Sequence, residues 1–347
     1  MNAQGGEYGN ALQAASYRSH YEVCQILLHM GADVNIQDGH YGNALQAASY
    51  AGHYEIVMLL LENGTDVNAW GGQYGSALQA ASIGGHAEIV TLLLDKGTDV
   101  NAQGGHSGHS ALQAALYGGN VEIAALLLDK GADVNAQGGQ YGSALQAASF
   151  WGHTEIVTFL LDKGADVNVQ GGKCGNALQA ASSKGYAQIV TLLLDKGADV
   201  SAQGGEYGNA LQAASIFGHA EIVTLLLDKG ADVSAQGEHY CNALQAASYR
   251  GNVKMVKLLL DKGANACAQG GHYGNALQAA SYAGKVEIVN LLLDRGADVN
   301  AQGGENGNAL LAASYRGNVE IVDLLLDKGA DVSAQDEEYG KIGRAHV

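Results

Sequence analysis

Histidine and cysteine are the first candidates for chemistry in this 347-residue sequence. His106 and His109 share one short loop, and two imidazoles at that spacing could chelate a metal ion weakly. A third ligand is missing beside them, so we predict no metal site. The cysteines form no CxxC pair, which predicts thiols in a reducing compartment rather than a disulfide framework. They are Cys24, Cys174, Cys241 and Cys267.

Catalytic sites need a few unlike groups that converge in one pocket, and the sequence offers like groups at regular intervals instead. Five histidines recur at the turn after the first helix, four of them directly after a glycine and His20 after Ser19, a regularity that predicts a structural role at helix starts. They are His20, His53, His86, His153 and His219. The paired glycines lack the GxxxxGK[ST] phosphate loop, and no DxDxDG calcium loop occurs. We therefore predict a non-enzymatic protein without a cofactor.

Charge and hydropathy exclude further classes of function. The chain has 18 Lys+Arg against 35 Asp+Glu, a formal net charge of −17 without basic clusters, which argues against nucleic-acid binding. The longest apolar runs have only a few residues, so the sequence predicts no contact with a membrane by a spanning helix. No targeting segment follows Met1, which favours a cytoplasmic location and leaves the nucleus open.

One segment, Ala-Leu-Gln-Ala-Ala-Ser with small changes, is written ten times along the chain. Its starts are Ala11, Ala44, Ala77, Ala111, Ala144, Ala177, Ala210, Ala243, Ala276 and Ala309. Eight of the nine spacings are 33 residues, and the one between Ala77 and Ala111 is 34. The added residue lies within 104–109, which predicts a surface loop there.

Each unit predicts two short helices and an extended connection. In the second unit, Asn43 is expected to cap the first helix, over 44–49, and Gln46 to complete a capping box. Gly52 ends this helix, the second helix runs over about 54–63 with a broad apolar face, and Gly64 stops it. Neither helix is stable alone, so stacked units must bury their leucines together. The sequence predicts one all-α solenoid.

This unit resembles the ankyrin repeat. The resemblance lies in the 33-residue period and in strings such as Gly85-His86-Ala87-Glu88-Ile89-Val90-Thr91-Leu92-Leu93-Leu94-Asp95-Lys96-Gly97-Thr98-Asp99-Val100-Asn101-Ala102. Where that family usually opens its first helix with Thr-Pro-Leu-His, this chain has Asn43-Ala44-Leu45-Gln46 or its equivalent. The resemblance implies an ankyrin-repeat solenoid of ten helix-turn-helix units with extended hairpin-like loops. The glycine-rich loops look like arrays in fungal multidomain proteins.

The expected array covers residues 5–335. Its units are 5–37, 38–70, 71–103, 104–137, 138–170, 171–203, 204–236, 237–269, 270–302 and 303–335. Residues 336–341 look like the start of a truncated eleventh repeat. Residues 342–347 fit no repeat position, and we expect them to be a non-native tail.

Two zones vary among the ten copies, whereas the leucines, alanines and turn glycines are fixed. In the ankyrin family these zones line the concave face and contact protein partners. At the ends of the first helices the predicted contact residues are Tyr17, Arg18, Tyr50, Tyr117, Phe150, Trp151, Lys184, Ile216, Phe217, Tyr249, Arg250, Tyr282, Tyr315 and Arg316. At the loop tips they are His40, Gln73, Gln140, Lys173, Glu206, His239 and His272. We expect the groove to centre on Phe150, Trp151, Ile216 and Phe217.

The residue pattern leaves alternatives open within these zones. The rings at Tyr17 and Tyr50 either contact a partner or pack on the next helix. The following position is Gly in one copy and Trp in another, which favours binding because a core site would not accept both. Seven loop tips carry a tyrosine, which predicts packing of these rings along the row.

An aspartate recurs after the second helix and is replaced only at Asn265. It is Asp33, Asp66, Asp99, Asp133, Asp166, Asp199, Asp232, Asp298 and Asp331. We expect it to accept turn amides, and a row of like charges also favours a partner with a basic patch.

From these observations we predict that the chain is a monomeric array that binds a protein partner. The alternative is a C-terminal sensor or autoinhibitory segment of a larger nucleotide-binding signalling protein or enzyme. A third hypothesis is a spacer with no partner.

Overall fold

The computed structural model describes residues 5–6, 8–105, 108–237 and 242–333. These residues contain twenty α-helices, two in each of the ten repeats, and two short β-hairpins. The predicted all-α helix-turn-helix architecture with ten units is thus confirmed. The boundaries drawn between the repeats stay predictions, and the segments 336–341 and 342–347 lie outside the described residues.

The first helix of each repeat carries an odd number. These helices are α1 (Ala11–Tyr17), α3 (Ala44–Ala51), α5 (Ala77–Gly84), α7 (Ala111–Tyr117), α9 (Ala144–Trp151), α11 (Ala177–Lys184), α13 (Ala210–Phe217), α15 (Ala243–Arg250), α17 (Ala276–Tyr282) and α19 (Ala309–Tyr315). The second helices are α2 (Tyr21–His29), α4 (Tyr54–Glu62), α6 (Ala87–Asp95), α8 (Val121–Asp129), α10 (Thr154–Asp162), α12 (Ala187–Asp195), α14 (Ala220–Asp228), α16 (Val253–Asp261), α18 (Val286–Asp294) and α20 (Val319–Asp327).

Some loops between repeats form hairpins. Strand β1 (Gln103–Gly104) pairs antiparallel with β2 (His109–Ser110), and β3 (Gln137–Gly138) pairs with β4 (Gly142–Ser143). In three other loops a single bridge closes the hairpin, for example between Gly71 and Gly75. The expected hairpin-like form is therefore present in these five loops.

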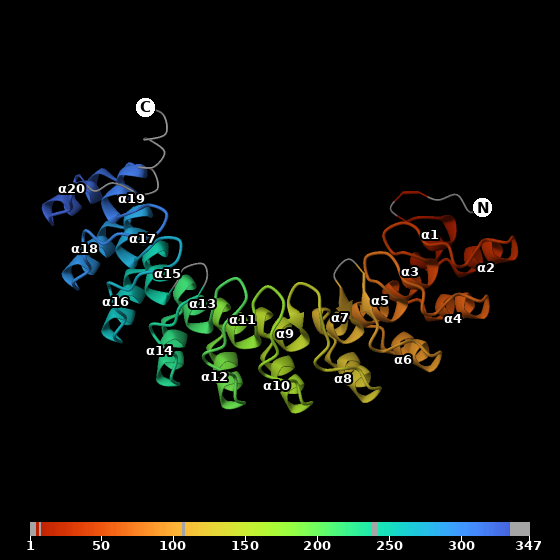
Figure 1. Cartoon of the computed structure of the whole chain (residues 1–347). Coiled ribbons are helices and arrows are strands. Elements are labelled where there is room, and N and C mark those ends of the chain that lie inside the picture. Colours follow the sequence, from red (N-terminus) through yellow and green to blue (C-terminus); the bar gives the residue numbers. More distant parts are fainter. Residues whose placement is uncertain (1–4, 7, 106–107, 238–241, 334–347) are drawn as a thin grey trace. The chain divides into compact units, whose positions relative to one another are not determined.

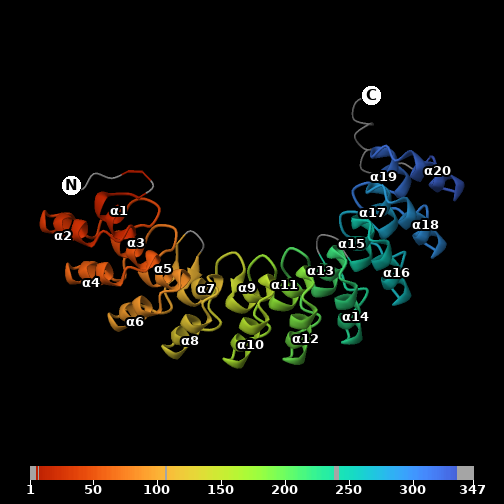
Figure 2. The same ribbon diagram turned by 180° about the vertical axis from the view of Figure 1, so that it is seen from behind.

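The chain divides into two compact units, 1–148 with 153–173 and 149–152 with 174–347. In the first unit α1 packs on α3, α3 on α5 and α5 on α7. In the second unit α11 packs on α13, and the same contact continues through α15, α17 and α19. Helices α1, α3, α5 and α7 of the first unit and α11, α13, α15, α17 and α19 of the second also pack on the second helix of their own repeat. Within a unit the two kinds of helix therefore form two adjoining rows (Figures 1 and 2).

The first helices begin at the predicted capping box. The Asn43 side chain accepts a hydrogen bond from the Gln46 amide at 2.8 Å, and the Asn43 amide donates to Gln46 Oε1 at 2.7 Å. Gly52 ends the helix in the left-handed region, with φ of +81°. The helix is two residues longer than predicted and reaches Ala51. Local side-chain chemistry therefore sets both ends of this helix.

The glutamine of the capping box also binds the following repeat, which the sequence analysis missed. Gln46 Nε2 donates to three carbonyl oxygens of the next loop, those of Ala69 at 3.2 Å, Gly71 at 3.3 Å and Gly75 at 2.7 Å. We call this arrangement the glutamine clamp. Clamps of the same kind are made by Gln13, Gln79, Gln113, Gln146, Gln179, Gln212, Gln245 and Gln278. The amide is buried, so a polar side chain fixes each loop against the previous helix.

The predicted turn aspartates and three of the predicted structural histidines also have partners. Asp33 Oδ1 accepts the Asn35 amide at 2.9 Å, which confirms the expected turn. His53 precedes α4, and its Nε2 lies 2.9 Å from the Tyr17 carbonyl oxygen of the preceding repeat. This histidine is structural as predicted, although its contact joins two repeats.

Exposed ion pairs follow the ends of the second helices. The first described pair joins Lys130 Nζ to Asp95 Oδ1 at 3.4 Å. Other pairs of this register include Lys163–Asp129, Lys229–Asp195, Lys262–Asp228, Arg295–Asp261 and Lys328–Asp294. Such exposed pairs stabilise a fold by only about 0–1 kcal/mol each, so burial and the glutamine clamps dominate. None of the described helices has both the length and the apolar character needed to cross a membrane.

Candidate functional site

The loop tips and the ends of the first helices together form a row of aromatic rings. In repeats 1–3 we define the aromatic row as Tyr8, Tyr17, Tyr41, Tyr50 and Tyr74. The ring of Tyr41 stacks on Tyr17 at 4.6 Å, and that of Tyr74 stacks on Tyr50 at 4.5 Å. Tyr41 also meets Tyr50 in a tilted contact at 5.8 Å. Tyr41 thus lies between the ends of α1 and α3, and Tyr74 stacks on the end of α3, which confirms the predicted packing along the row for these tip tyrosines.

The rings of Tyr17 and Tyr50, for which the sequence left two alternatives, stack on the tip tyrosine of the next repeat. Their contact with a partner stays a prediction. Tyr41 is only 9% exposed. Burial raises the pKa of the Tyr41 and Tyr74 hydroxyls above the ordinary value, and hydrogen bonds to Tyr17 and Tyr50 add to the effect. These rings are held as neutral phenols in a packed surface layer.

In the second unit, basic side chains accompany the aromatic rings. Lys184 Nζ lies 4.1 Å from the centre of the Phe150 ring, and the Arg316 guanidinium lies 4.9 Å from that of Tyr282. The Arg250 guanidinium lies 5.9 Å from the centre of Phe217. These distances are within the range of cation–π attraction. The rings keep open surface, since Trp151 is 47% and Phe217 is 44% exposed.

One predicted contact residue is wrong. Ile216 was expected at the centre of the groove, but it is only 4% exposed and belongs to the core of the second unit. The aliphatic Ile216 side chain is buried in the core of the second unit, and the next residue, Phe217, carries the exposed surface. The first positions of the variable pairs do not share one environment, since Tyr117 is 57% exposed and Tyr315 is 77% exposed.

The other predicted contact residues fall into three groups. Half-buried side chains are Tyr17, Tyr50, Phe150, Tyr249 and Tyr282. Exposed side chains are Arg18, Tyr117, Trp151, Lys184, Phe217, Arg250, Tyr315 and Arg316, together with the tip residues His40, Gln73, Gln140, Lys173, Glu206 and His272. His239 lies outside the described residues, as does His106 of the considered metal pair.

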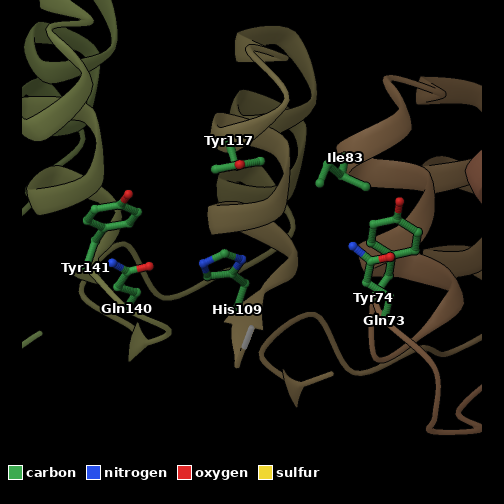
Figure 3. Close-up of a pocket in the computed structure, with 7 residues that line it drawn as sticks. All are labelled: Gln73, Tyr74, Ile83, His109, Tyr117, Gln140 and Tyr141. Atoms are coloured by element: carbon green, nitrogen blue, oxygen red, sulfur yellow. The ribbon is translucent and has the colours of Figure 1, made fainter. Parts of the chain in front are cut away.

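The aromatic row is interrupted at repeat 4, where the surface is hollowed. The hollow has a volume of about 440 Å³. Figure 3 shows its lining, which is Gln73, Tyr74, Ile83, His109, Tyr117, Gln140 and Tyr141. We call it the repeat-4 pocket. The sequence analysis missed it, although the 34-residue spacing marked the place.

His109 is the one titratable imidazole of this lining. Its ring lies 6.0 Å from that of Tyr117, and it pairs through the backbone with Gly104 in the β1–β2 hairpin. Burial lowers the pKa of His109 below its ordinary value, so the imidazole is neutral at pH 7. The pocket therefore offers rings, amides and a neutral imidazole rather than charge.

Comparisons with known proteins agree with this architecture. A family model described as ankyrin repeats (3 copies) matches residues 11–104, 46–138, 103–171, 145–237 and 244–336. A protein of Monascus ruber named azaphilone pigments biosynthesis cluster protein L is 68% identical over 34 residues, which are 10% of this chain and 7% of that protein. Ankyrin repeats are generally protein-interaction modules and are typically non-enzymatic. Because the family model matches well over half of the sequence, the chain belongs to the ankyrin-repeat family.

Proposed function

We propose that this chain is a non-enzymatic binding module that captures a protein partner through the loop tips and the ends of its first helices. The observation that carries the proposal is the exposure of Trp151 and Phe217, at 47% and 44%. Large aromatic rings and arginines supply much of the binding energy of known interfaces. Lys184 and Arg250 lie against Phe150 and Phe217 and would add cationic contacts there.

The charge of this surface bears on the partner. Its charged members are Arg18, Lys173, Lys184, Arg250 and Arg316 on the basic side and Glu206 on the acidic side. The exposed aspartate row, in contrast, uses Oδ1 of Asp66 to accept the Asn68 amide at 3.0 Å. We propose that the direct contacts are aromatic and cationic. The aspartates contribute to the net charge of −17, and this negative charge would attract a basic patch of the partner over longer range.

The alternative role, as a sensor or autoinhibitory segment of a larger protein, uses the same surface. In that case the partner would be another part of the same polypeptide. We further propose that the array acts as a monomer of 35.7 kDa. Analytical ultracentrifugation of the purified chain measures its mass in solution and checks this.

A displayed library of random peptides, selected against the full chain, tests the proposal. We expect enriched peptides to bind the wild-type chain and to bind the Trp151→Ala/Phe217→Ala variant at least about tenfold more weakly, the loss of one or two interface anchors. The matched control is Tyr54→Ala, which removes a partly exposed ring that lies on a second helix. Equal binding to all three chains would contradict the proposed surface. Failure to enrich any peptide would contradict the binding function.

A further inference from the structure

The repeat-4 pocket lies where the aromatic row is interrupted. Near the end of helix α5, Ile83 occupies the place where α3 has Tyr50 and α1 has Tyr17. The inserted residue places His109 directly before the capping Ser110, a position held by Gly42 and Gly75 in the two preceding loops. No tyrosine occurs in the whole 104–110 loop. The row that runs from Tyr8 to Tyr74 is therefore broken at this point.

The intact repeats show what such a place holds. Between the ends of α1 and α3 the ring of Tyr41 fills the space, 4.6 Å from Tyr17 and 5.8 Å from Tyr50. The equivalent space at repeat 4 lies between Ile83, in the last turn of α5, and Tyr117, the last residue of α7, and both line the pocket. In Figure 3, Tyr74 and Ile83 face this space from one side, and His109 and Tyr117 face it from the other. Repeat 4 has no tyrosine for this space; its described loop residues contribute the imidazole of His109, 6.0 Å from the Tyr117 ring, and the pocket beside that imidazole is open.

The mouth of the pocket is also left uncovered by the helix ends beside it. In repeat 1, Arg18 extends over the rings of Tyr8 and Tyr17, at 5.9 and 5.6 Å from their centres. Repeats 3 and 4 have Gly84 and Gly118 at this position. A Cβ atom at Gly84 would lie 2.6 Å from the Tyr50 carbonyl oxygen, so a side chain there would require the backbone to shift.

The lining specifies the chemistry of a ligand. It consists of three tyrosines, one isoleucine, two glutamine amides and His109, whose low pKa leaves it neutral at pH 7. A volume of about 440 Å³ lies within the range of ordinary ligand pockets, roughly 300–1,000 Å³. Stacked or tilted rings at the spacing of the aromatic row gain about 0.5–1.5 kcal/mol beyond the burial of their area. A flat, uncharged ring fits these walls better than an aliphatic or charged group.

The geometry points to the repeat-4 pocket as the binding site for an uncharged aromatic side chain, tyrosine or phenylalanine, of a protein partner. The inference rests on the proposed function, because the ring must arrive on another polypeptide segment. In effect, the partner supplies the ring that repeats 1–3 supply for themselves. Gln73 and Gln140, whose exposed amides flank the space, would bind the adjoining backbone or the phenol hydroxyl.

The test uses p-cresol, the side chain of tyrosine as a free molecule, with the full-length chain. Ligand-observed saturation-transfer NMR measures its binding, with 4-methylcyclohexanol as the saturated analogue of similar size. We expect p-cresol to bind with a dissociation constant on the order of 1 mM, which suits so small a ligand. It should bind about fivefold more tightly than the saturated analogue, the factor that ring–ring contact supplies.

Two variants show whether the signal comes from this pocket. Ile83→Tyr supplies the missing ring and should abolish p-cresol binding, whereas Ile83→Leu keeps an aliphatic wall and should retain it. Binding that survives in a folded Ile83→Tyr chain, or equal binding of the two probes, would overturn the inference. The outcome is separable from that of the peptide selection. Enriched peptides that need Trp151 and Phe217 would leave the proposed function standing even if p-cresol does not bind.

Discussion

Repeats 1–3 and repeat 4 are built on the same scaffold and differ in what covers it. In both regions the glutamine clamp is present, since Gln46 binds the loop of repeat 3 and Gln79 binds the loop of repeat 4 through the carbonyl oxygens of Ala102 and His109. In the first region the surface above the clamps is filled by stacked tyrosines, and in the second it opens into a pocket. One inserted residue, and the absence of a tyrosine from the 104–110 loop and from position 83, therefore change the surface while the buried glutamine clamps are kept.

The largest difference between the two regions should be seen when a ring is removed from each. Tyr41→Ala removes a ring that is 9% exposed and packed between two others, and we expect the free energy of unfolding to fall by about 3 kcal/mol. Tyr117→Ala removes a ring that is 57% exposed and should cost less than about 1 kcal/mol. Urea unfolding followed by circular dichroism measures both. Similar losses would show that the two regions are packed alike.

The clamp itself should be equally important on both sides of the comparison. Gln46→Leu and Gln79→Leu keep an apolar side chain of similar size but leave buried amide and carbonyl groups without partners. We expect each to lower the free energy of unfolding by about 2 kcal/mol, the usual cost of such groups. Gln73→Leu, at an exposed loop tip, is the matched control and should change it by less than about 0.5 kcal/mol. A large loss in only one of the two clamp variants would break the claim of a common framework.

Alkaline pH should weaken the filled region selectively. The pKa values of Tyr41 and Tyr74 are raised in the folded chain, so folding favours the protonated phenols. Their contribution is complete below the ordinary tyrosine pKa of about 10 and is lost as the pH rises above it. Between about pH 9.5 and 11 we expect the wild-type chain to lose about 1 kcal/mol more than the Tyr41→Phe/Tyr74→Phe variant, which lacks both phenols. Thermal unfolding across this range checks the difference, and parallel curves for the two chains would contradict it.

The smallest effect comes from filling the gap. Ile83→Tyr should restore a continuous row and raise the free energy of unfolding by about 0.5–1 kcal/mol, the contribution of one aromatic pair. Ile83→Leu should leave it unchanged within error. Urea unfolding measures both variants. A loss of stability in Ile83→Tyr would mean that the space between α5 and α7 is not shaped for a ring.

Local features of the fold were predictable from the sequence, and contacts between repeats were not. The capping box of Asn43, the end of α3 at Gly52 and the turn at Asp33 depend on residues within four positions of one another. The second role of Gln46 depends on a loop 23 to 29 residues further along the chain. Glutamine occupies this position in nine of the ten copies, but the capping box alone was sufficient to explain that repetition.

The candidate site was predictable to a similar degree. The two variable zones do lie together, because the hairpin loops bring the tips to the helix ends. Ile216 was misplaced because periodicity within a helix of eight residues does not show which side the next loop covers. The repeat-4 pocket arises from residues of three consecutive repeats, so no single unit contains its pattern.

The most direct test of the contrast between a filled row and an open pocket is NMR of a chain labelled at its isoleucine methyl groups. Ile83 lines the pocket, whereas Ile56 and Ile89 are buried in the second helices of repeats 2 and 3. On titration with p-cresol the account predicts a saturable ring-current shift of the Ile83 methyl resonance, with those of Ile56 and Ile89 unchanged. An unmoved Ile83 resonance, or equal shifts at all three methyl groups, would contradict it.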